Sequence, residues 1–149
     1  MDDFKPFEDK LTGLIASLSP GGRRRLTVDI AKKLRQRQQQ RIKSQTSPDG
    51  SPFTPRKRPP VRAKKGRIKR EMFAKLRTNR FMKATGDDGA AVVEFTGKVQ
   101  RIARVHQFGL RDKPSPKSAA IQYAERQLLG FSEDDRQLVE SILIDHLAS

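Results

Sequence analysis

The chain of 149 residues has no cysteine, no tryptophan and only one tyrosine. Without cysteine, neither a disulfide framework nor a thiolate metal site can form. No hydrophobic run approaches the roughly 20 residues that a membrane-spanning helix requires, so we expect no membrane association. The first residues, Met1-Asp2-Asp3, are acidic and no hydrophobic signal region follows them. We therefore expect the protein to be made and used in cytoplasm.

Hydrophobic residues are also scarce. They make up 34% of the chain, whereas about 45–50% apolar residues, glycine included, is usual for a globular protein. They cluster near both ends and at 90–108, and residues 43–67 have almost none. We expect a single domain over 1–149, with a small core made by the flanks. The middle should finish ordering only against a partner or an identical subunit.

Negative charge is nearly missing from the middle of the chain. Residues 20–83 contain 22 lysines and arginines against three acids, a net charge of +19, while residues 1–19 and 84–149 each sum to −2. The total of +15 is therefore a property of the middle alone. So strong a field indicates a polyanionic or acidic partner, either nucleic acid or the acidic surface of another protein.

The spacing of apolar residues predicts a mainly helical α+β fold with a small antiparallel sheet and a long Pro-rich basic arm. Ser19 and Pro20 form a strong helix start, and Gln38 stands in the apolar stripe of that helix where leucine would be expected. Residues 99–105 fit either a second strand or a short helix. The remaining elements are helices over 3–18, from Pro20 to about Ser44, over 67–83 and from Ser132, a strand over 91–95, and a loop over 110–120.

The predicted arm or long loop covers residues 45–66. Its five prolines prevent a helix and interrupt any central strand. Ser47-Pro48-Asp49-Gly50 is a turn signal, because proline sets φ, aspartate bonds nearby backbone and glycine accepts positive φ. The residues expected to anchor the arm are Pro48, Asp49, Gly50 and Phe53.

The densest positive charge begins inside this arm. Affinity for phosphates grows with the number of counterions released, and this segment supplies many cations but no tryptophan or tyrosine that could stack on bases. Two interpretations stay open: non-specific contact with DNA, or contact with the acidic surface of a neighbouring subunit. The candidate contact residues are Arg56, Lys57, Arg58, Arg62, Lys64, Lys65, Arg67, Lys69 and Arg70.

No pattern indicates an enzyme. Neither a Ser-His-Asp nor a Cys-His arrangement is visible, and Gly21-Gly22 lacks the spacing of a phosphate-binding loop. His106 is interpreted as part of a turn, with Phe108 packed inward and Gly109 at positive φ. We therefore expect no catalytic residue, no metal site and no cofactor.

Several segments together resemble the phage virion morphogenesis family, most closely the tail completion proteins of temperate, contractile-tailed phages. The likeness runs from Phe7 to Leu147, and Phe53 stands where the wider family often has tryptophan. The matching segments are Gln38-Gln39-Gln40-Arg41, Ser47-Pro48-Asp49-Gly50 with Phe53, the run from Lys64 to Arg77, Arg104-Val105-His106-Gln107-Phe108-Gly109, and Leu128-Leu129-Gly130-Phe131.

This resemblance implies a structural protein of the virion without enzymatic activity, assembled in the cytoplasm of the bacterial host. It implies action at the head-proximal end of the tail, the neck, in tail assembly and in the joining of tails to DNA-filled heads. It further implies a ring of identical subunits, a hexamer that matches tail symmetry, in contact with other tail or neck proteins. The alternative, from the charge alone, is a module that binds nucleic acid non-specifically.

Overall fold

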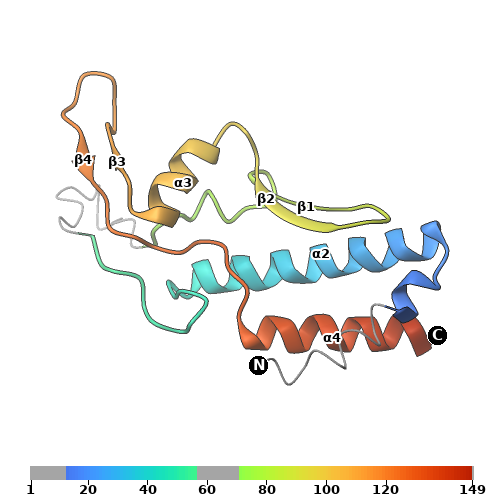
Figure 1. The fold of residues 1–149 in the computed structure, drawn as a ribbon. Coiled ribbons are helices and arrows are strands. Elements are labelled where there is room, and N and C mark those ends of the chain that lie inside the picture. The colour runs from blue at the N-terminus through green and yellow to red at the C-terminus, as the bar shows by residue number, and fades with distance from the viewer. Residues whose placement is uncertain (1–12, 57–70, 149) are drawn as a thin grey trace, which may run out of the picture. The chain divides into compact units, whose positions relative to one another are not determined.

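The computed structural model describes residues 13–56 and 71–148, which form two compact units (Figure 1). Of the described residues, unit 1 comprises 13–35, 84–94 and 133–148, and unit 2 comprises 36–56, 71–83 and 95–132. The elements with defined bounds are α2 (Pro20–Lys43), β1 (Met82–Gly86), β2 (Ala91–Phe95), α3 (Gln100–Phe108), β3 (Arg111–Asp112), β4 (Ile121–Gln122) and α4 (Glu133–Ala148). The predicted α+β class, mainly helical with small antiparallel sheets, is confirmed.

Unit 1 is built around the first part of α2. Figure 1 shows the hairpin of β1 and β2 on one side of this helix and α4 on the other. Leu26, Ile30 and Ile142 form a buried cluster between α2 and α4, as their helical spacing predicts. The partly buried hydrophobic residues packed against this cluster are Ile15, Leu18, Leu34, Ala91, Leu138, Val139 and Leu143.

The turn of the hairpin is fastened to α2 by polar contacts. The Thr27 hydroxyl donates to the carbonyl of Asp87 at 2.5 Å, and Arg23 Nε donates to the carbonyl of Asp88 at 3.2 Å. A Cβ atom on Gly86 would lie 2.5 Å from the backbone nitrogen of Val28, so the strand approaches the helix too closely for any side chain there. The Asp87 carboxylate accepts the backbone N–H groups of Gly89 and Ala90 and so closes the turn.

The predicted helix starts are confirmed. The Gly22 N–H donates to Ser19 Oγ at 3.0 Å, which is the bond of an N-cap serine. At the other end of unit 1, α4 begins directly after Ser132. Of the predicted helix over 3–18, residues 13–16 are helical and residues 3–12 lie outside the described residues.

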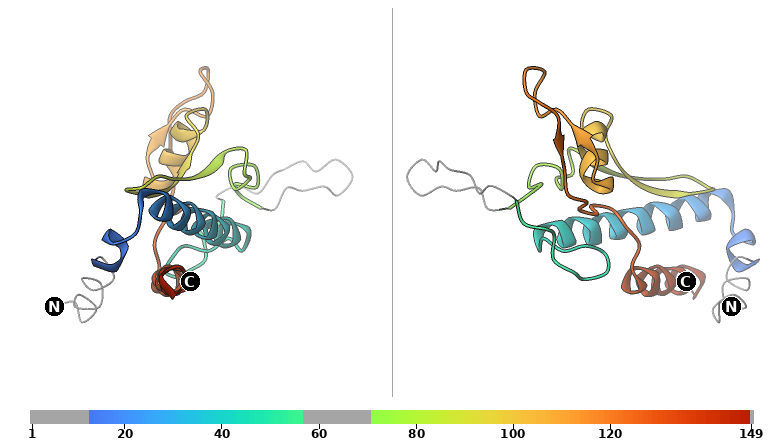
Figure 2. Two further views of the ribbon diagram at one scale, coloured as in Figure 1. Left: turned by 90° about the vertical axis from the view of Figure 1, so that its right-hand side faces the viewer. Right: turned by 60° about the vertical axis from the view of Figure 1, so that its left-hand side comes forward.

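Unit 2 contains α3 and the short antiparallel pair of β3 and β4, in which Arg111 faces Gln122 and Asp112 faces Ile121. Figure 2 shows the connection between these strands extending beyond α3. Of the two alternatives for 99–105, the helix is observed, since α3 covers this stretch. The strand predicted over 91–95 is observed as β2, and its partner is the preceding β1. The loop predicted over 110–120 is wrong in part, because β3 begins at Arg111.

Residues 45–56 form a loop closed by an isolated bridge between Thr46 and Pro52. The predicted turn at Ser47-Pro48-Asp49-Gly50 is present, with a bond from the Gly50 N–H to the Ser47 carbonyl and φ of 89° at Gly50. The Asp49 carboxylate accepts bonds from the hydroxyl and, with a smaller effect, from the backbone N–H of Ser51, and both lower the pKa of Asp49. Residues 57–66 lie outside the described residues, so the extended arm stays a prediction.

The helix predicted over 67–83 is wrong for its described part. Residues 71–81 form successive turns and β1 begins at Met82. Phe73 has φ of 66°, a left-handed conformation that interrupts a helix. The spacing of Met72 and Leu76 does mark buried residues, but they are buried by turns instead of by a helix.

Candidate functional site

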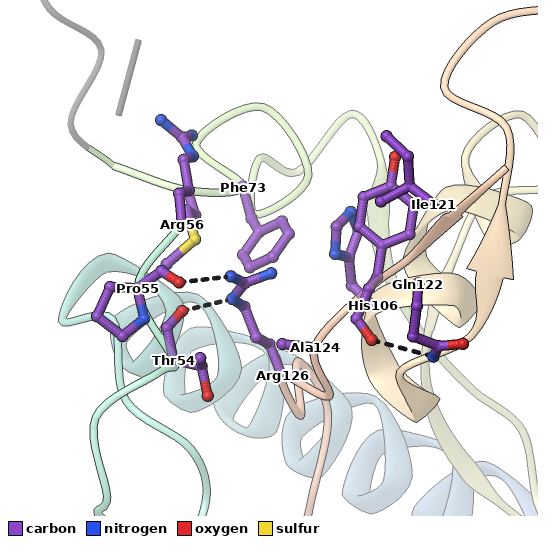
Figure 3. Close-up of a pocket in the computed structure, with 11 residues that line it drawn as sticks. Thr54, Pro55, Arg56, Phe73, His106, Ile121, Gln122, Ala124 and Arg126 are labelled. Atoms are coloured by element: carbon purple, nitrogen blue, oxygen red, sulfur yellow. Dashed lines mark hydrogen bonds between the residues drawn. The ribbon is translucent and has the colours of Figure 1, made fainter. Parts of the chain in front are cut away.

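Unit 2 contains a pocket of about 740 Å³ between the loop of residues 45–56, the turns after residue 70, the end of α3 and β4 (Figure 3). Among its lining residues, the charged side chains are two arginines, and there is no acid. The pocket is lined by Thr54, Pro55, Arg56, Met72, Phe73, His106, Ile121, Gln122, Tyr123, Ala124 and Arg126.

Four rings form a continuous row along this pocket. The ring centroids of Phe53 and Phe73 are 5.8 Å apart, those of Phe73 and His106 4.8 Å, and those of His106 and Tyr123 5.0 Å. Each pair meets edge to face, the geometry that the charge distribution of aromatic rings favours. Phe53 is buried at the inner end of the row, so the row is rooted in the core of unit 2.

Arg126 is a buried cation held in place by the loop of residues 45–56. Its Nε donates to the carbonyl of Thr54 at 2.6 Å and its Nη2 to the carbonyl of Pro55 at 3.1 Å. Figure 3 shows the remaining nitrogen, Nη1, on the side of the guanidinium that faces Phe73 and His106. Burial, and to a lesser degree the positive charge of Arg56, lowers the pKa of Arg126, as expected for a cation in a low-dielectric site.

His106 lies in the last turn of α3, between the rings of Phe73 and Tyr123. Burial and the nearby charge of Arg126 lower the pKa of His106, so the neutral imidazole is favoured in the fold. Its Nδ1 is buried and has no hydrogen-bond partner in the described part of the chain. The pocket therefore contains one buried nitrogen without a hydrogen-bond partner among the described residues, His106 Nδ1, near the positive charge of Arg126.

Two glutamines fix the walls of the pocket. Gln45 accepts the Met72 N–H at 3.0 Å and donates to the Met72 carbonyl at 2.9 Å, which holds the segment that includes Phe73. Gln107 accepts the N–H groups of Leu128 and Leu129 at 2.8 and 2.9 Å, which holds the segment that follows Arg126. The positions of the pocket residues are therefore set by side chain–backbone bonds on both sides.

Only one predicted contact residue can be placed. Arg56 lines the pocket, whereas Lys57, Arg58, Arg62, Lys64, Lys65, Arg67, Lys69 and Arg70 lie outside the described residues. Of the predicted anchors, Phe53 reaches the aromatic row, while Asp49 and Gly50 lie exposed in the turn. Phe108, predicted to pack inward, is 61% exposed, because Gly109 at φ of 63° ends α3 directly after it and His106 takes the inward position.

The sequence reasoning missed Phe73, Tyr123 and Arg126 as members of one site. In the sequence, Tyr123 is a single tyrosine without an aromatic neighbour, and Arg126 is one of 32 lysines and arginines. No local spacing joins them, since they meet only through the tertiary fold of unit 2. Among the described residues, no group of three or more His, Asp or Glu side chains is placed to hold a metal ion.

A second positively charged surface belongs to α2. The helix contains nine lysines and arginines and a single acid, Asp29. Asp29 lies 3.0 Å from His146 Nε2 of α4. The cations classed as exposed are Arg24, Arg25, Lys32, Lys33 and Lys43. Within the described ranges, no helix is long and apolar enough to cross a membrane.

Comparison with known proteins places these features in a family context. Residues 2–148 match the phage virion morphogenesis family. The chain is 51% identical over 148 residues to the "Tail completion protein S" of Escherichia phage P2, and the match covers 99% of both chains. No solved structure matches the chain.

Proposed function

This chain belongs to the phage virion morphogenesis family, and on that premise we propose that it is a structural tail completion protein of the virion. The observation that supports this role is the likeness to a tail completion protein across nearly the full length of both chains. The family is one of structural tail proteins and not of enzymes.

We further propose that the protein acts at the head-proximal end of the tail, in the neck, where completed tails join DNA-filled heads. It would do so as a ring of identical subunits, a hexamer. A ring needs a heterologous interface, in which one surface of a subunit meets a different surface of the next. The large positive charge of residues 20–83 and the acidic flanks supply two surfaces of opposite sign.

Complementation tests this function directly. The chain would be supplied to cells infected by phage P2 that lacks its own tail completion protein S. We expect tails of normal length to form and to join heads, with density for the protein at the head-proximal end in images of the particles. Complete particles with the protein absent from them, or no recovery of particles by a well-expressed chain, would contradict the proposal.

Non-specific contact with packaged DNA is a second candidate role, favoured by the exposed cations of α2. Binding of duplex DNA by the purified chain should weaken by orders of magnitude between about 50 and 200 mM salt if several phosphates are contacted. Fluorescence anisotropy with two unrelated duplexes measures this. Equal affinity for both duplexes supports backbone contact, and no binding at low salt removes the role.

A further inference from the structure

The pocket of unit 2 combines an apolar, aromatic wall with positive charge. Phe73, Tyr123 and Ile121 supply the apolar surface, and Arg126 supplies a cation that two carbonyls hold in one orientation. Among the described residues that line the pocket, no acid is present to neutralise that cation. A site of this kind suits a ligand that presents a carboxylate next to an aromatic or aliphatic side chain.

Two groups in the pocket favour an acceptor in particular. Arg126 Nη1 makes no hydrogen bond within the described residues, although Nε and Nη2 each make one. His106 Nδ1 is buried and unpartnered, and the neutral imidazole donates from this atom in one of its two tautomers. A buried donor without a partner costs free energy, so an incoming carboxylate oxygen is stabilised here.

The chain itself contains a segment with this chemistry. Near its N-terminus, Asp3 directly precedes Phe4, and Phe7 directly precedes Glu8 and Asp9. These residues lie outside the described part of the chain. Elsewhere, the phenylalanine next to a carboxylate is Phe95, which follows Glu94 and is buried in unit 2.

We propose that this pocket binds residues 1–9 of a second copy of the chain, with a phenylalanine against Phe73 and Tyr123 and a carboxylate at Arg126. The proposal rests on the ring in the proposed function, because a head-to-tail contact joins two different surfaces of the subunit. In this contact, the pocket of unit 2 on one subunit binds residues 1–9 of the next subunit.

The test uses the full-length chain with a matched pair of substitutions at Ile121. This side chain lines the pocket from β4 and is 45% exposed, so a charged replacement does not have to be buried. Ile121→Glu places a negative charge beside the incoming acids, and Ile121→Lys places a positive charge of similar length there. We expect Ile121→Glu to weaken self-association by at least about tenfold and Ile121→Lys to leave it unchanged or stronger. Sedimentation velocity over a concentration series measures the association.

Changes in residues 1–9 test the bound segment. Phe4→Ser with Phe7→Ser should abolish self-association, because the side chains that would contact Phe73 and Tyr123 are removed, and Glu8→Gln with Asp9→Asn should weaken it, because carboxylates that would reach Arg126 are removed. The proposal is overturned if both Ile121 variants associate alike, if these changes in residues 1–9 leave association unaltered, or if the unchanged chain is monomeric at every concentration. Complementation separates the two proposals. If the chain completes tails but its Ile121 variants associate alike, the proposed function is supported and the proposed binding of residues 1–9 in the pocket is wrong.

Discussion

A single glutamine shows how a local exception to the apolar pattern becomes a structural contact. Gln38 stands in the apolar stripe of α2 and is only 4% exposed. Its Oε1 accepts the backbone N–H of Gly130 at 3.1 Å and also a bond from Arg41 Nη2. Arg41 Nη2 in turn donates to the Gly130 carbonyl at 2.8 Å. The pair therefore satisfies both backbone groups of Gly130, which leucine at this position would not do.

Gln38→Leu should therefore destabilise the protein, even though it completes the apolar stripe. The substitution leaves the Gly130 N–H without its acceptor and removes one of the acceptors of Arg41 Nη2, at a cost of about 1–3 kcal/mol in the free energy of unfolding. Urea denaturation followed by circular dichroism measures it. Gln40→Leu, on the exposed side of the same helix, is the control and should change stability by less than about 0.5 kcal/mol. A Gln38→Leu chain as stable as the original would contradict this role.

His106 makes stability depend on pH. Because burial lowers its pKa in the fold below the ordinary value of 6.5, the unfolded chain binds a proton more readily than the folded chain. The stabilisation is thus fully present above about pH 6.5 and is lost as the pH falls below it. Unfolding free energies at pH 7.5 and pH 5.5 should show this loss.

His106→Gln isolates the contribution, since glutamine keeps a polar side chain that does not titrate. The difference in unfolding free energy between the two pH values should be smaller in this variant than in the original chain. All other ionisable groups are the same in both chains, so their contributions cancel in the comparison. An unchanged difference would show that His106 is not the group responsible.

At the scale of elements, α4 stabilises unit 1 through one face. Ile142 is 6% exposed in the cluster with Leu26 and Ile30, whereas Ile144, two residues further on, is 50% exposed. Ile142→Ala should lower the free energy of unfolding by about 2–5 kcal/mol, because it removes buried methyl groups and leaves a cavity. Ile144→Ala should change it by less than about 0.5 kcal/mol. Thermal or urea denaturation of the two variants measures these changes. Equal losses of stability in Ile142→Ala and Ile144→Ala would mean that α4 does not pack as described.

The elements predicted correctly are those with local signals. α2 starts at a serine cap followed by proline, β2 is a β-branched run between glycines, and α4 follows a serine with acids in its first turn. The segment after residue 70 has the same apolar spacing as a helix but forms turns. Its left-handed Phe73 is stabilised by ring contacts to Phe53 and His106 that no local pattern contains.

The candidate site was the least predictable part for the same reason. Phe73, His106, Tyr123 and Arg126 come from three separate stretches and share no spacing. The positive φ predicted at Gly109 is observed, but the turn predicted at His106 is wrong, because His106 lies in the last turn of α3, and Phe108, predicted to pack inward, is exposed. In a helix with 3.6 residues per turn, His106 and Phe108 are two positions apart and point to nearly opposite sides, so only one of them is able to face inward.

At the scale of the whole molecule, the position of the charge should matter more than its amount. Changing Lys64, Lys65, Arg67, Lys69 and Arg70 to Gln should reduce recovery of complete phage in the complementation assay by at least about tenfold, because docking of the basic segment is weakened. The control changes Arg24, Arg25, Lys32, Lys33 and Lys43 to Gln, which removes the same five charges from α2. Phage titre is the readout. Equal losses in both variants would show that net charge alone is responsible.

Both compact units are discontinuous in sequence, and this bears on the order of events at the ribosome. Leu26 and Ile30 contact Ile142 only after α4 has emerged from the ribosome. The carbonyls of Thr54 and Pro55 accept hydrogen bonds from Arg126 only after that residue has been translated. Unit 2 is therefore unable to close before Arg126 has been translated, and unit 1 is unable to close before Ile142 has been translated. A product of premature termination would therefore retain loose hydrophobic surface, which proteases recognise, before it reaches a growing particle.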